Sequence, residues 1–393
     1  MREHRKSIIV FLGVTFLFWL TLYLYVPTLP TYIKTRTVNL SMVGLVLSMY
    51  GLLMAVFRLP VGIAVDSAGW GKPFIVGGLF FGALGAFTMG KGNSLGAIAA
   101  GRALTGVSAA TWVPLLVVFS SFFSPEEAIY SSAMLSFTAS FGRLVGTGLT
   151  GVLNRAAGYQ LPFYLATATG VIAICIMLLT KETRRTKREV SLVSIGALFL
   201  RRDVVFPAII SIIVHYAEFA VTFGFLPILA QDMGAGDVVK SLLISMNIVA
   251  ITVANLLNTL LLKRVSHTLI LSCGGLIYFA GIMTIALSPS LSWIYPGTML
   301  MGFAFGLTYP ILLGMSIHKV EQGQRSTAMG IHQALYSIGM FTGPWLTGVI
   351  ADFIGIRHTF LFTAGFFLVS VYLFIFLLHR NSQKTGSYSR KEG

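Results

Sequence analysis

Charged residues are scarce in this sequence, and acidic ones are the scarcest. Of the 393 residues only 10% are charged, whereas a soluble domain carries about 25%. Aspartate and glutamate number 13 against 28 lysines and arginines, and 55% of the residues are hydrophobic. A water-soluble fold of this composition would expose far too much apolar surface, so a soluble protein is excluded.

Several chemical motifs are also absent. The two cysteines, Cys175 and Cys273, lie within apolar stretches, so neither a disulfide framework nor a metal cluster is expected. No phosphate-binding Gly-x-x-x-x-Gly-Lys-Ser/Thr loop occurs, which excludes ATP as the direct energy source. No His-Glu-x-x-His occurs either, and no pair of acids lies within an apolar stretch, which argues against an intramembrane enzyme. We therefore expect no enzymatic activity, no metal and no cofactor.

Long hydrophobic runs are abundant instead. A helix needs about 20 apolar residues to cross a bilayer, and twelve such segments follow one another along the chain. They span residues 8–29, 41–64, 73–90, 95–119, 130–153, 161–180, 204–230, 239–262, 269–288, 293–317, 326–350 and 359–378. The sequence predicts an all-α membrane protein with twelve transmembrane helices.

The basic residues indicate the orientation of these helices. If the N-terminus is cytoplasmic, the inner loops and tails hold 19 of the 28 lysines and arginines and the outer loops hold six. This excess places both termini in the cytoplasm, because basic residues favour the cytoplasmic side of a cell membrane. The net charge of +15 does not indicate nucleic-acid binding, since no basic stretch is interleaved with stacking aromatic residues.

An internal repeat divides the chain at its middle. Four residues of the fourth span recur 196 positions later in the tenth: Gly101, Leu104, Gly106 and Pro114 match Gly297, Leu300, Gly302 and Pro310. The Leu-Thr-Gly-Val run at 149–152 recurs 197 positions later at 346–349. Six spans per repeat is an even number, so both copies have the same orientation and the substrate site is expected between them.

The repeat predicts three parts of the chain. These are an N-terminal six-helix bundle over 1–180, a cytoplasmic linker over 181–203, and a C-terminal six-helix bundle with a cytoplasmic tail over 204–393. The middle of the linker, Ser191 to Leu200, is apolar. It is expected either to form a short helix at the membrane surface or to lead directly into the seventh span.

The loop between the second and third spans carries a family resemblance. Gly62-Ile-Ala-Val-Asp66-Ser-Ala-Gly69-Trp-Gly71-Lys72 is similar to the Gly-x-x-x-Asp-x-x-Gly-x-(x)-basic loop of the major facilitator superfamily (MFS). The resemblance implies the fold of that family, with two pseudo-symmetric halves. It also implies that Gly62, Asp66, Gly69 and Lys72 form a cytoplasmic latch between the halves. Ser67 and Trp70 stand where basic residues are usual, and an ordinary turn capped by Asp66 is the alternative.

Two further segments resemble the drug:proton antiporter branch of this family. Arg102-Ala-Leu-Thr-Gly106 is similar to its Arg-x-x-x-Gly segment, which implies a role for Arg102 in proton coupling. The glycines of the fifth span resemble the antiporter motif, although Thr147 replaces its proline, and the eleventh span contains Gly343-Pro344. The branch implies efflux; the alternative is that these glycines serve only close helix packing.

Four formal charges fall inside predicted spans: Arg58, Arg102, Arg143 and Glu218. Each costs at least a few kcal/mol in a bilayer, so each needs a partner or a water-filled cavity. Glu218 is the only acid deep in a span, and a carboxyl group held out of water exchanges protons near neutral pH. We therefore expect Glu218 to couple transport to protons, with His215, one helical turn earlier, sharing the proton or orienting the carboxyl. The alternative is a structural ion pair between Glu218 and one of the arginines.

Further candidates for the substrate cavity come from the first, seventh and eleventh spans. They are the aromatic residues Trp19, Tyr23, Phe219 and Phe223, together with His332 and Tyr336. Arg58 and Arg143 complete the expected cavity. For any single aromatic residue, packing against lipid or core is the alternative, and a lone buried histidine is usually just hydrogen-bonded.

These features predict a proton-coupled secondary transporter of a small organic solute that works by alternating access. The antiporter resemblance favours efflux of drug-like or amphipathic compounds. Three arginines against one acid inside the spans suit an anionic or zwitterionic solute, so the alternative is a proton symporter that imports an organic anion or metabolite. The expected partners are the solute, protons and the lipid bilayer, and the chain is expected to be a monomer.

Overall fold

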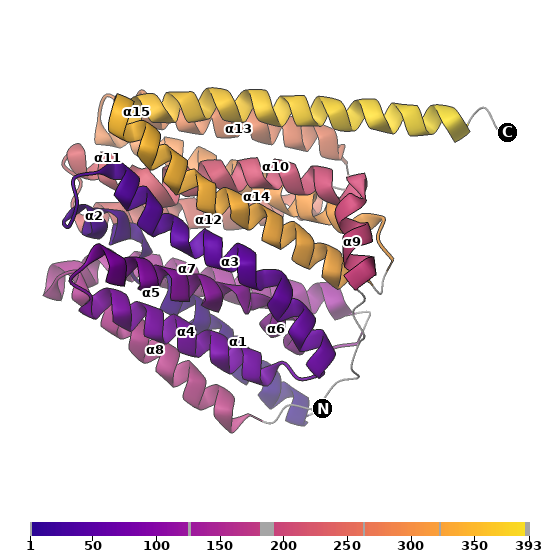
Figure 1. Cartoon of the computed structure of the whole chain (residues 1–393), viewed down its shortest axis with the longest axis horizontal. Coiled ribbons are helices and arrows are strands. Elements are labelled where there is room, and N and C mark those ends of the chain that lie inside the picture. Colours follow the sequence, from indigo (N-terminus) through magenta and orange to yellow (C-terminus); the bar gives the residue numbers. More distant parts are fainter. Residues whose placement is uncertain (1, 125–126, 181–191, 262–263, 322–323, 390–393) are drawn as a thin grey trace.

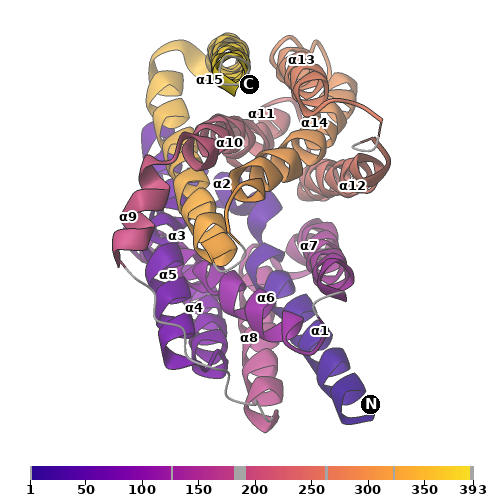
Figure 2. The ribbon, with the colours of Figure 1, turned by 90° about the vertical axis from the view of Figure 1, so that its right-hand side faces the viewer.

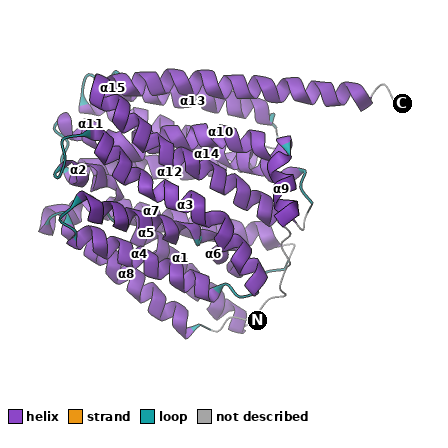
Figure 3. Cartoon of the chain, in the orientation of Figure 1, coloured by secondary structure: helices purple, strands orange, loops and turns teal. Residues whose placement is uncertain are grey.

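The structure is a computed structural model. It describes residues 2–124, 127–180, 192–261, 264–321 and 324–389. Within these ranges the chain is helical with short connections and contains no strand, as Figure 3 shows. The all-α class predicted from the hydrophobic runs is confirmed.

The first half of the chain makes six passes through the bundle. Its elements are α1 (Arg2–Tyr23), η1 (Val26–Thr28), α2 (Leu29–Lys34), α3 (Leu40–Ala68), α4 (Lys72–Lys91), α5 (Leu95–Ala110), α6 (Trp112–Ser120), α7 (Ala128–Ala157) and α8 (Gln160–Leu179). The first pass is built from α1, η1 and α2, and the fourth from α5 and α6. Each other pass is one helix.

The second half follows the short helix α9 (Leu192–Leu200) and makes six more passes. Its elements are α10 (Arg202–Ala220), the π-helical turn η3 (Val221–Phe225), α11 (Leu226–Asp232), α12 (Asp237–Leu261), α13 (His267–Ala286), α14 (Leu291–His318) and α15 (Arg325–Ser389). The long α15 holds two passes, because Gly355 has φ 80° and ψ 160° and turns the chain back on itself.

The twelve predicted membrane helices correspond to these twelve passes. Ten continuous stretches of the described residues are long and apolar enough to cross a membrane. One of them, Thr327–Leu373, covers both passes of α15. The remaining pass is α7, in which Ser, Thr, Gly and Arg143 dilute the apolar residues. The predicted fold, twelve helices in two halves of six, is confirmed.

The two halves meet along two seams, α3 against α15 and α7 against α12, which Figures 1 and 2 show from two directions. Both seams depend on glycine. A Cβ atom on Gly44 of α3 would lie 2.1 Å from the carbonyl oxygen of Pro344, and one on Gly151 of α7 would lie 2.4 Å from that of Asp237. Because these backbones touch, any side chain at either position would force the halves apart.

Both ends of the chain and α9 lie at one end of the bundle (Figure 1), which we call the linker face; the opposite end is the far face. The apolar middle of the linker forms the short helix α9, the first of the two alternatives considered for it. Its Ile195 and Leu198 are buried in a cluster with Val204, Val320, Ala328 and Ile331. Leu59 and Ile63 of α3 pack against the same cluster, so the cluster that holds α9 joins residues of both halves. Linker residues 181–191 lie outside the described residues.

Three passes are interrupted within the membrane span. The first changes helix after Tyr23, ahead of Pro27 and Pro30. The fourth breaks at Thr111, and the seventh contains the π-helical turn η3. Interrupted helices leave backbone groups unpaired and are frequent at functional sites.

Candidate functional site

Six aromatic side chains lie between the halves, next to the three interruptions. We call them the aromatic layer: Trp19, Tyr23, Tyr50 and Trp112 from the first half, and Phe219 and Phe223 from the second. The ring centroids of Trp19 are 5.3 Å from Trp112 and 5.8 Å from Tyr23. Between the two halves, the ring centroids of Tyr23 and Phe223 are 6.3 Å apart, and those of Tyr50 and Phe219 are also 6.3 Å apart. Four of the six were predicted as cavity residues; Tyr50 and Trp112 were not.

Two of the membrane arginines lie on this layer. The guanidinium carbon of Arg143 is 4.7 Å from the centroid of the Trp19 ring and 5.9 Å from that of Tyr23. That of Arg102 is 4.2 Å from the centroid of the Tyr50 ring. Both cations therefore rest on π faces, which attract them electrostatically.

Their hydrogen bonds to the protein are few. Arg143 donates two long bonds within its own helix, of 3.4 Å to the Ala139 carbonyl and 3.5 Å to the Ser140 hydroxyl. The Nε atom of Arg102 is buried without a hydrogen-bond partner among the described residues. A guanidinium carries five N–H donors, so both arginines retain donor capacity toward the layer.

Arg58 is held differently. It is only 3% exposed, and its Nη1 donates to the Ala109 carbonyl at 2.8 Å, just before the break at Thr111. Its Nη2 donates to the hydroxyl of Tyr336, on α15, at 2.9 Å. Arg58 thus uses a carbonyl at the end of α5 and ties the two halves together.

His215 and Tyr336 form the next contact on the C-terminal side. Their rings are parallel within 8°, with centroids 4.0 Å apart. Tyr309 packs edge-on against both, at 5.1 Å and 5.6 Å, and the Nδ1 atom of His215 is 2.8 Å from the Ser211 carbonyl oxygen. Arg58, Tyr336 and His215 therefore form one chain of contacts between the halves, a hydrogen bond followed by a ring stack.

His332 joins three helices. Its Nε2 atom lies 3.0 Å from the Ser211 hydroxyl and its Nδ1 atom 2.7 Å from the Ser316 hydroxyl. Ser316 donates its single hydroxyl hydrogen to the Val204 carbonyl, so Nδ1 of His332 is the donor to Ser316. This histidine is fully buried and fastens α15 to α10 and α14.

Glu218 lies inside the C-terminal bundle. It is 1% exposed, and one carboxyl oxygen, Oε2, accepts a short hydrogen bond from the Tyr278 hydroxyl of α13. Thr222 and Asn247 lie beside the carboxyl, but its other oxygen, Oε1, has no hydrogen-bond partner among the described residues. Tyr278 and Asn247 were not singled out from the sequence, because a tyrosine or asparagine in an apolar run carries no motif.

The geometry of α10 explains which predicted residues meet. Ser211, His215 and Phe219 are spaced four apart; the first two meet α15, and Phe219 meets Tyr50 of the other half. Glu218 instead meets Tyr278 of α13, and Thr222 meets Met301 of α14. The structure brings His215 together with Tyr336 and Glu218 together with Tyr278. Among the described residues, Glu218 forms no ion pair with an arginine.

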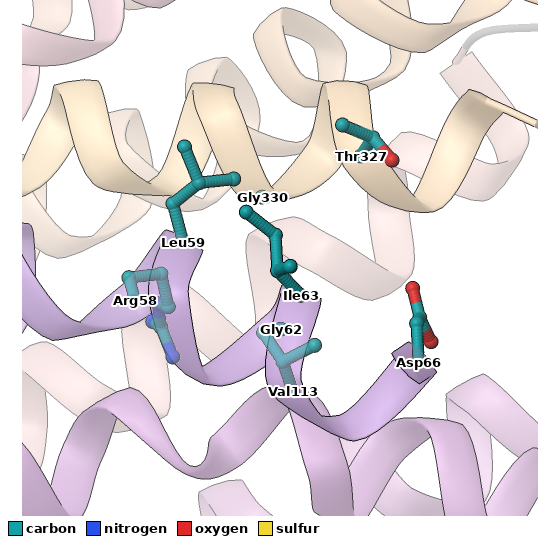
Figure 4. Close-up of a pocket in the computed structure, with 8 residues that line it drawn as sticks. All are labelled: Arg58, Leu59, Gly62, Ile63, Asp66, Val113, Thr327 and Gly330. Carbon is teal, nitrogen blue, oxygen red and sulfur yellow. The ribbon is translucent and has the colours of Figure 1, made fainter. Parts of the chain in front are cut away.

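The C-terminal part of α3 borders a small cavity (Figure 4). The cavity measures about 20 Å³, enough for about one water molecule, and is lined by Arg58, Leu59, Gly62, Ile63, Asp66, Val113, Thr327 and Gly330. Gly62 makes no close helix contact, because a Cβ there would meet only Val113, at 4.0 Å. Gly69 has φ 65° and ends α3, a conformation that favours glycine.

Lys72, the first residue of α4, binds within the N-terminal half. Its Nζ donates to the carbonyl oxygens of Leu178 at 2.9 Å and Thr180 at 2.5 Å, where α8 ends. Carbonyls at the end of a helix are the negative pole of its dipole. These contacts of Lys72 therefore anchor α8, whereas Asp66 lies in the cavity beside Thr327 and Gly330 of α15.

A polar network that was not predicted from the sequence closes the far face. Lys240 is 1% exposed, and its Nζ lies 2.6 Å from an Asp237 carboxyl oxygen, 2.8 Å from Gln231 and 3.1 Å from Thr31 of the other half. Asn154, also of the other half, donates to Asp237 at 3.0 Å. Lys240 lies one turn after the start of α12, so it resembles an ordinary loop charge in sequence.

Three more contacts reinforce the far face. Lys34 and Asp232 form an exposed ion pair between the halves at 3.1 Å. Asp352 accepts from the backbone N–H groups of Leu40 and Ser41 at 2.7 Å and 2.9 Å, where the positive end of the α3 dipole lies. Tyr159, in the α7–α8 connection, is 3.5 Å from Asp237; burial, with Asp237 adding to it, raises the pKa of Tyr159.

The chain matches a known family over nearly its whole length. Residues 11–214 and 208–393 each match the model of the Major Facilitator Superfamily.

In the described ranges, no cluster of three or more His, Cys, Asp or Glu side chains is arranged to hold a metal ion.

Relatives and solved structures agree with this match. An uncharacterized MFS-type transporter of Methanocaldococcus jannaschii is 24% identical over 79% of this chain and 82% of its own length. Multidrug resistance protein 2 of Bacillus subtilis is 24% identical over 78% of each chain. The crystal structure of a bacterial homologue of the human lysosomal transporter Spinster, in an inward-facing and unoccupied conformation, is 15% identical, covers 98% of both chains and has a TM-score of 0.81. This chain therefore belongs to the major facilitator superfamily: it is an integral multi-pass membrane protein and a transporter, not an enzyme.

Proposed function

We propose that the protein exports a small amphipathic organic solute in exchange for protons. The observation that carries the proton coupling is the environment of Glu218. Its carboxyl is fully buried, accepts one hydrogen bond from Tyr278 and has no cation partner among the described residues. An ionised carboxylate in such a place is costly, so binding and release of a proton at Glu218 changes the free energy of the conformation that holds it.

The solute site proposed here is the aromatic layer. It lies between the halves, beside the interrupted first, fourth and seventh passes, where parallel-repeat transporters are expected to bind their substrates. Residues of both halves contribute to it, so a rocking movement of the halves would change its access. The far-face network and the Arg58–Tyr336 bond are the contacts that such a movement would have to break in turn.

The orientation of the protein in the membrane is inferred from its basic residues, and the direction of transport from a related protein. We place the linker face in the cytoplasm, because the loops and tails at that face carry most of the basic residues. The membrane is proposed to be the inner membrane of the cell, and the protein is proposed to be a monomer. On that assignment Gly62, Asp66, Gly69 and Lys72 form a cytoplasmic latch, and Arg102 assists proton coupling. Efflux is favoured by the relative named as a multidrug resistance protein.

The test uses the purified protein in proteoliposomes that contain a pH-sensitive dye. A panel of labelled amphipathic solutes is added with and without an imposed pH gradient. Export by exchange predicts solute movement opposite to the proton flux; movement with the protons would make the protein a symporter that imports its solute.

The decisive variant is Glu218→Gln, which keeps the size of the side chain and removes its titration. We expect it to abolish gradient-driven accumulation and to leave solute exchange between equal concentrations partly intact. Full gradient-driven accumulation in Glu218→Gln would reject Glu218 as the coupling residue. Glu127→Gln, at the exposed start of α7, is the matched control.

A further inference from the structure

We infer that the solute bound at the aromatic layer is an amphipathic organic anion, with Arg143 and Arg102 as its charge partners. This inference rests on the proposed function in one respect, namely that the aromatic layer is the solute site. It adds a chemical class: a flat apolar body that carries a carboxylate, sulfonate or similar group. Neither proton coupling nor the direction of transport enters it.

The first observation is the difference between the three membrane arginines, of which Arg58 and Arg102 are buried and Arg143 is half-buried. Both terminal nitrogens of Arg58 donate within the protein, Nη1 to the Ala109 carbonyl at 2.8 Å and Nη2 to the Tyr336 hydroxyl at 2.9 Å, and only its Nε lacks a partner among the described residues. Arg143 has two long bonds within its own helix, and Arg102 has a buried Nε without a partner in the described chain. Arg143 and Arg102 are thus the cations whose donors remain for a ligand.

The second observation is the lack of a compensating acid at the layer. The described residues form ion pairs at Lys34–Asp232, Arg201–Asp203 and Lys240–Asp237, all near the two ends of the bundle. Glu218 points away from the layer, to Tyr278 inside the C-terminal bundle. A cation in a bilayer without a counter-charge is costly, so an entering anion is stabilised there and an entering cation is repelled.

The third observation is what faces the two arginines. Arg143 lies over Trp19 and Tyr23, whose rings continue to Trp112 and, through Phe223, to Phe219. Flat apolar groups stack favourably on such rings. In addition, the indole Nε1–H of Trp19 is buried without a partner among the described residues, and it supplies a further donor for an anionic oxygen.

Three probes that share one ring system test the charge preference. They are 2-naphthoate, the neutral 2-naphthalenemethanol and the cation 2-naphthylmethylammonium, each titrated calorimetrically into the wild-type protein in detergent at constant pH. We expect 2-naphthoate to bind at least about tenfold more tightly than either analogue, because a charge-assisted hydrogen bond is worth about 1.5–3 kcal/mol.

Variants of Arg143 assign the preference to the layer. Arg143→Gln should weaken 2-naphthoate by about tenfold or more and change the alcohol by less than about threefold, whereas Arg143→Lys should retain part of the anion preference. Arg155→Gln, which removes an exposed arginine at the far end of the same helix, should bind all three probes as the wild type does. The unfolding temperature of each variant in detergent identifies any that fail to fold, and Arg102→Gln then serves as the second cation-removing variant.

Three results would overturn the inference. They are equal or tighter binding of the ammonium probe, no binding of 2-naphthoate at millimolar concentration, and an anion preference that persists in both Arg143→Gln and Arg102→Gln. Because no membrane or gradient is present, failure of proton coupling would leave these affinities unchanged. The two proposals can therefore fail separately.

Discussion

Arg58 of α3 donates a hydrogen bond to the hydroxyl of Tyr336 on α15, with 2.9 Å between the two atoms. The bond joins residues 278 positions apart in the sequence and crosses from one half of the molecule to the other. The same tyrosine ring stacks on His215. The contact therefore ties an arginine of the N-terminal half to two helices of the C-terminal half, close to the linker face.

Removal of the Tyr336 hydroxyl should shift the conformational balance. Tyr336→Phe keeps the ring stacked on His215 but deletes an acceptor to a charged donor, worth about 1.5–3 kcal/mol. We expect the seam to open more often at the linker face. The measurement is the rate at which a cysteine placed at Thr327, in the small cavity, reacts with a polar maleimide. An unchanged rate would mean that Arg58 finds another partner without cost; Tyr372→Phe, which loses a hydroxyl bond within one half, is the control.

The buried pair at the far face should behave unlike the exposed one. Lys240→Met leaves Asp237 without its cation; because Asp237 is 23% exposed and also accepts from Asn154, the cost should be somewhat below the about 3–5 kcal/mol of a fully buried pair. The double variant Lys240→Met/Asp237→Asn should regain much of that loss. Lys34→Met, which breaks the half-exposed pair with Asp232, should cost no more than about 1 kcal/mol. Thermal unfolding in detergent gives all three values, and equal losses for Lys240→Met and Lys34→Met would contradict the assignment of Lys240 as the buried member.

Gly44 should be essential for closure of the far face. In Gly44→Ala the new Cβ would fall 2.1 Å from the Pro344 carbonyl oxygen, so α3 and α15 would have to separate there. We expect loss of transport together with faster labelling of a cysteine placed at Ser41. Gly13→Ala is the control, since nothing lies within 4 Å of its Cβ; it should stabilise α1 by about 0.5–1 kcal/mol. Wild-type transport in Gly44→Ala would show that the far face need not close at this point.

Much of the fold could be predicted because it follows from local composition. Each pass has its own apolar run, and the repeat at 196–197 residues pairs the halves. The apolar stretch between basic residues predicted either a short helix such as α9 or a direct lead into the seventh span. The π-helical turn η3 was not predicted, because Gly224 and its neighbours carry no sequence pattern that separates π from α geometry.

The candidate site was less predictable, since helix packing decides which way each side chain points. His215 and Glu218 are three residues apart, and that spacing leaves about 60° between their directions on a helix. The angle was enough for His215 to meet α15 and for Glu218 to meet α13. Lys240 resembled a loop charge because its partner Thr31 is 209 residues away, and no local signal records such a contact.

Glu218 and Phe219 are consecutive in the chain, yet α10 presents one to the interior of the C-terminal bundle and the other to the seam. The helix α10 thus separates the carboxyl group on one side from the stacked aromatic rings on the other. A proton and a solute held on its two sides would never touch. A shift or turn of α10 would move both sites at once, and this coupling would add to the Coulomb interaction that acts across the helix.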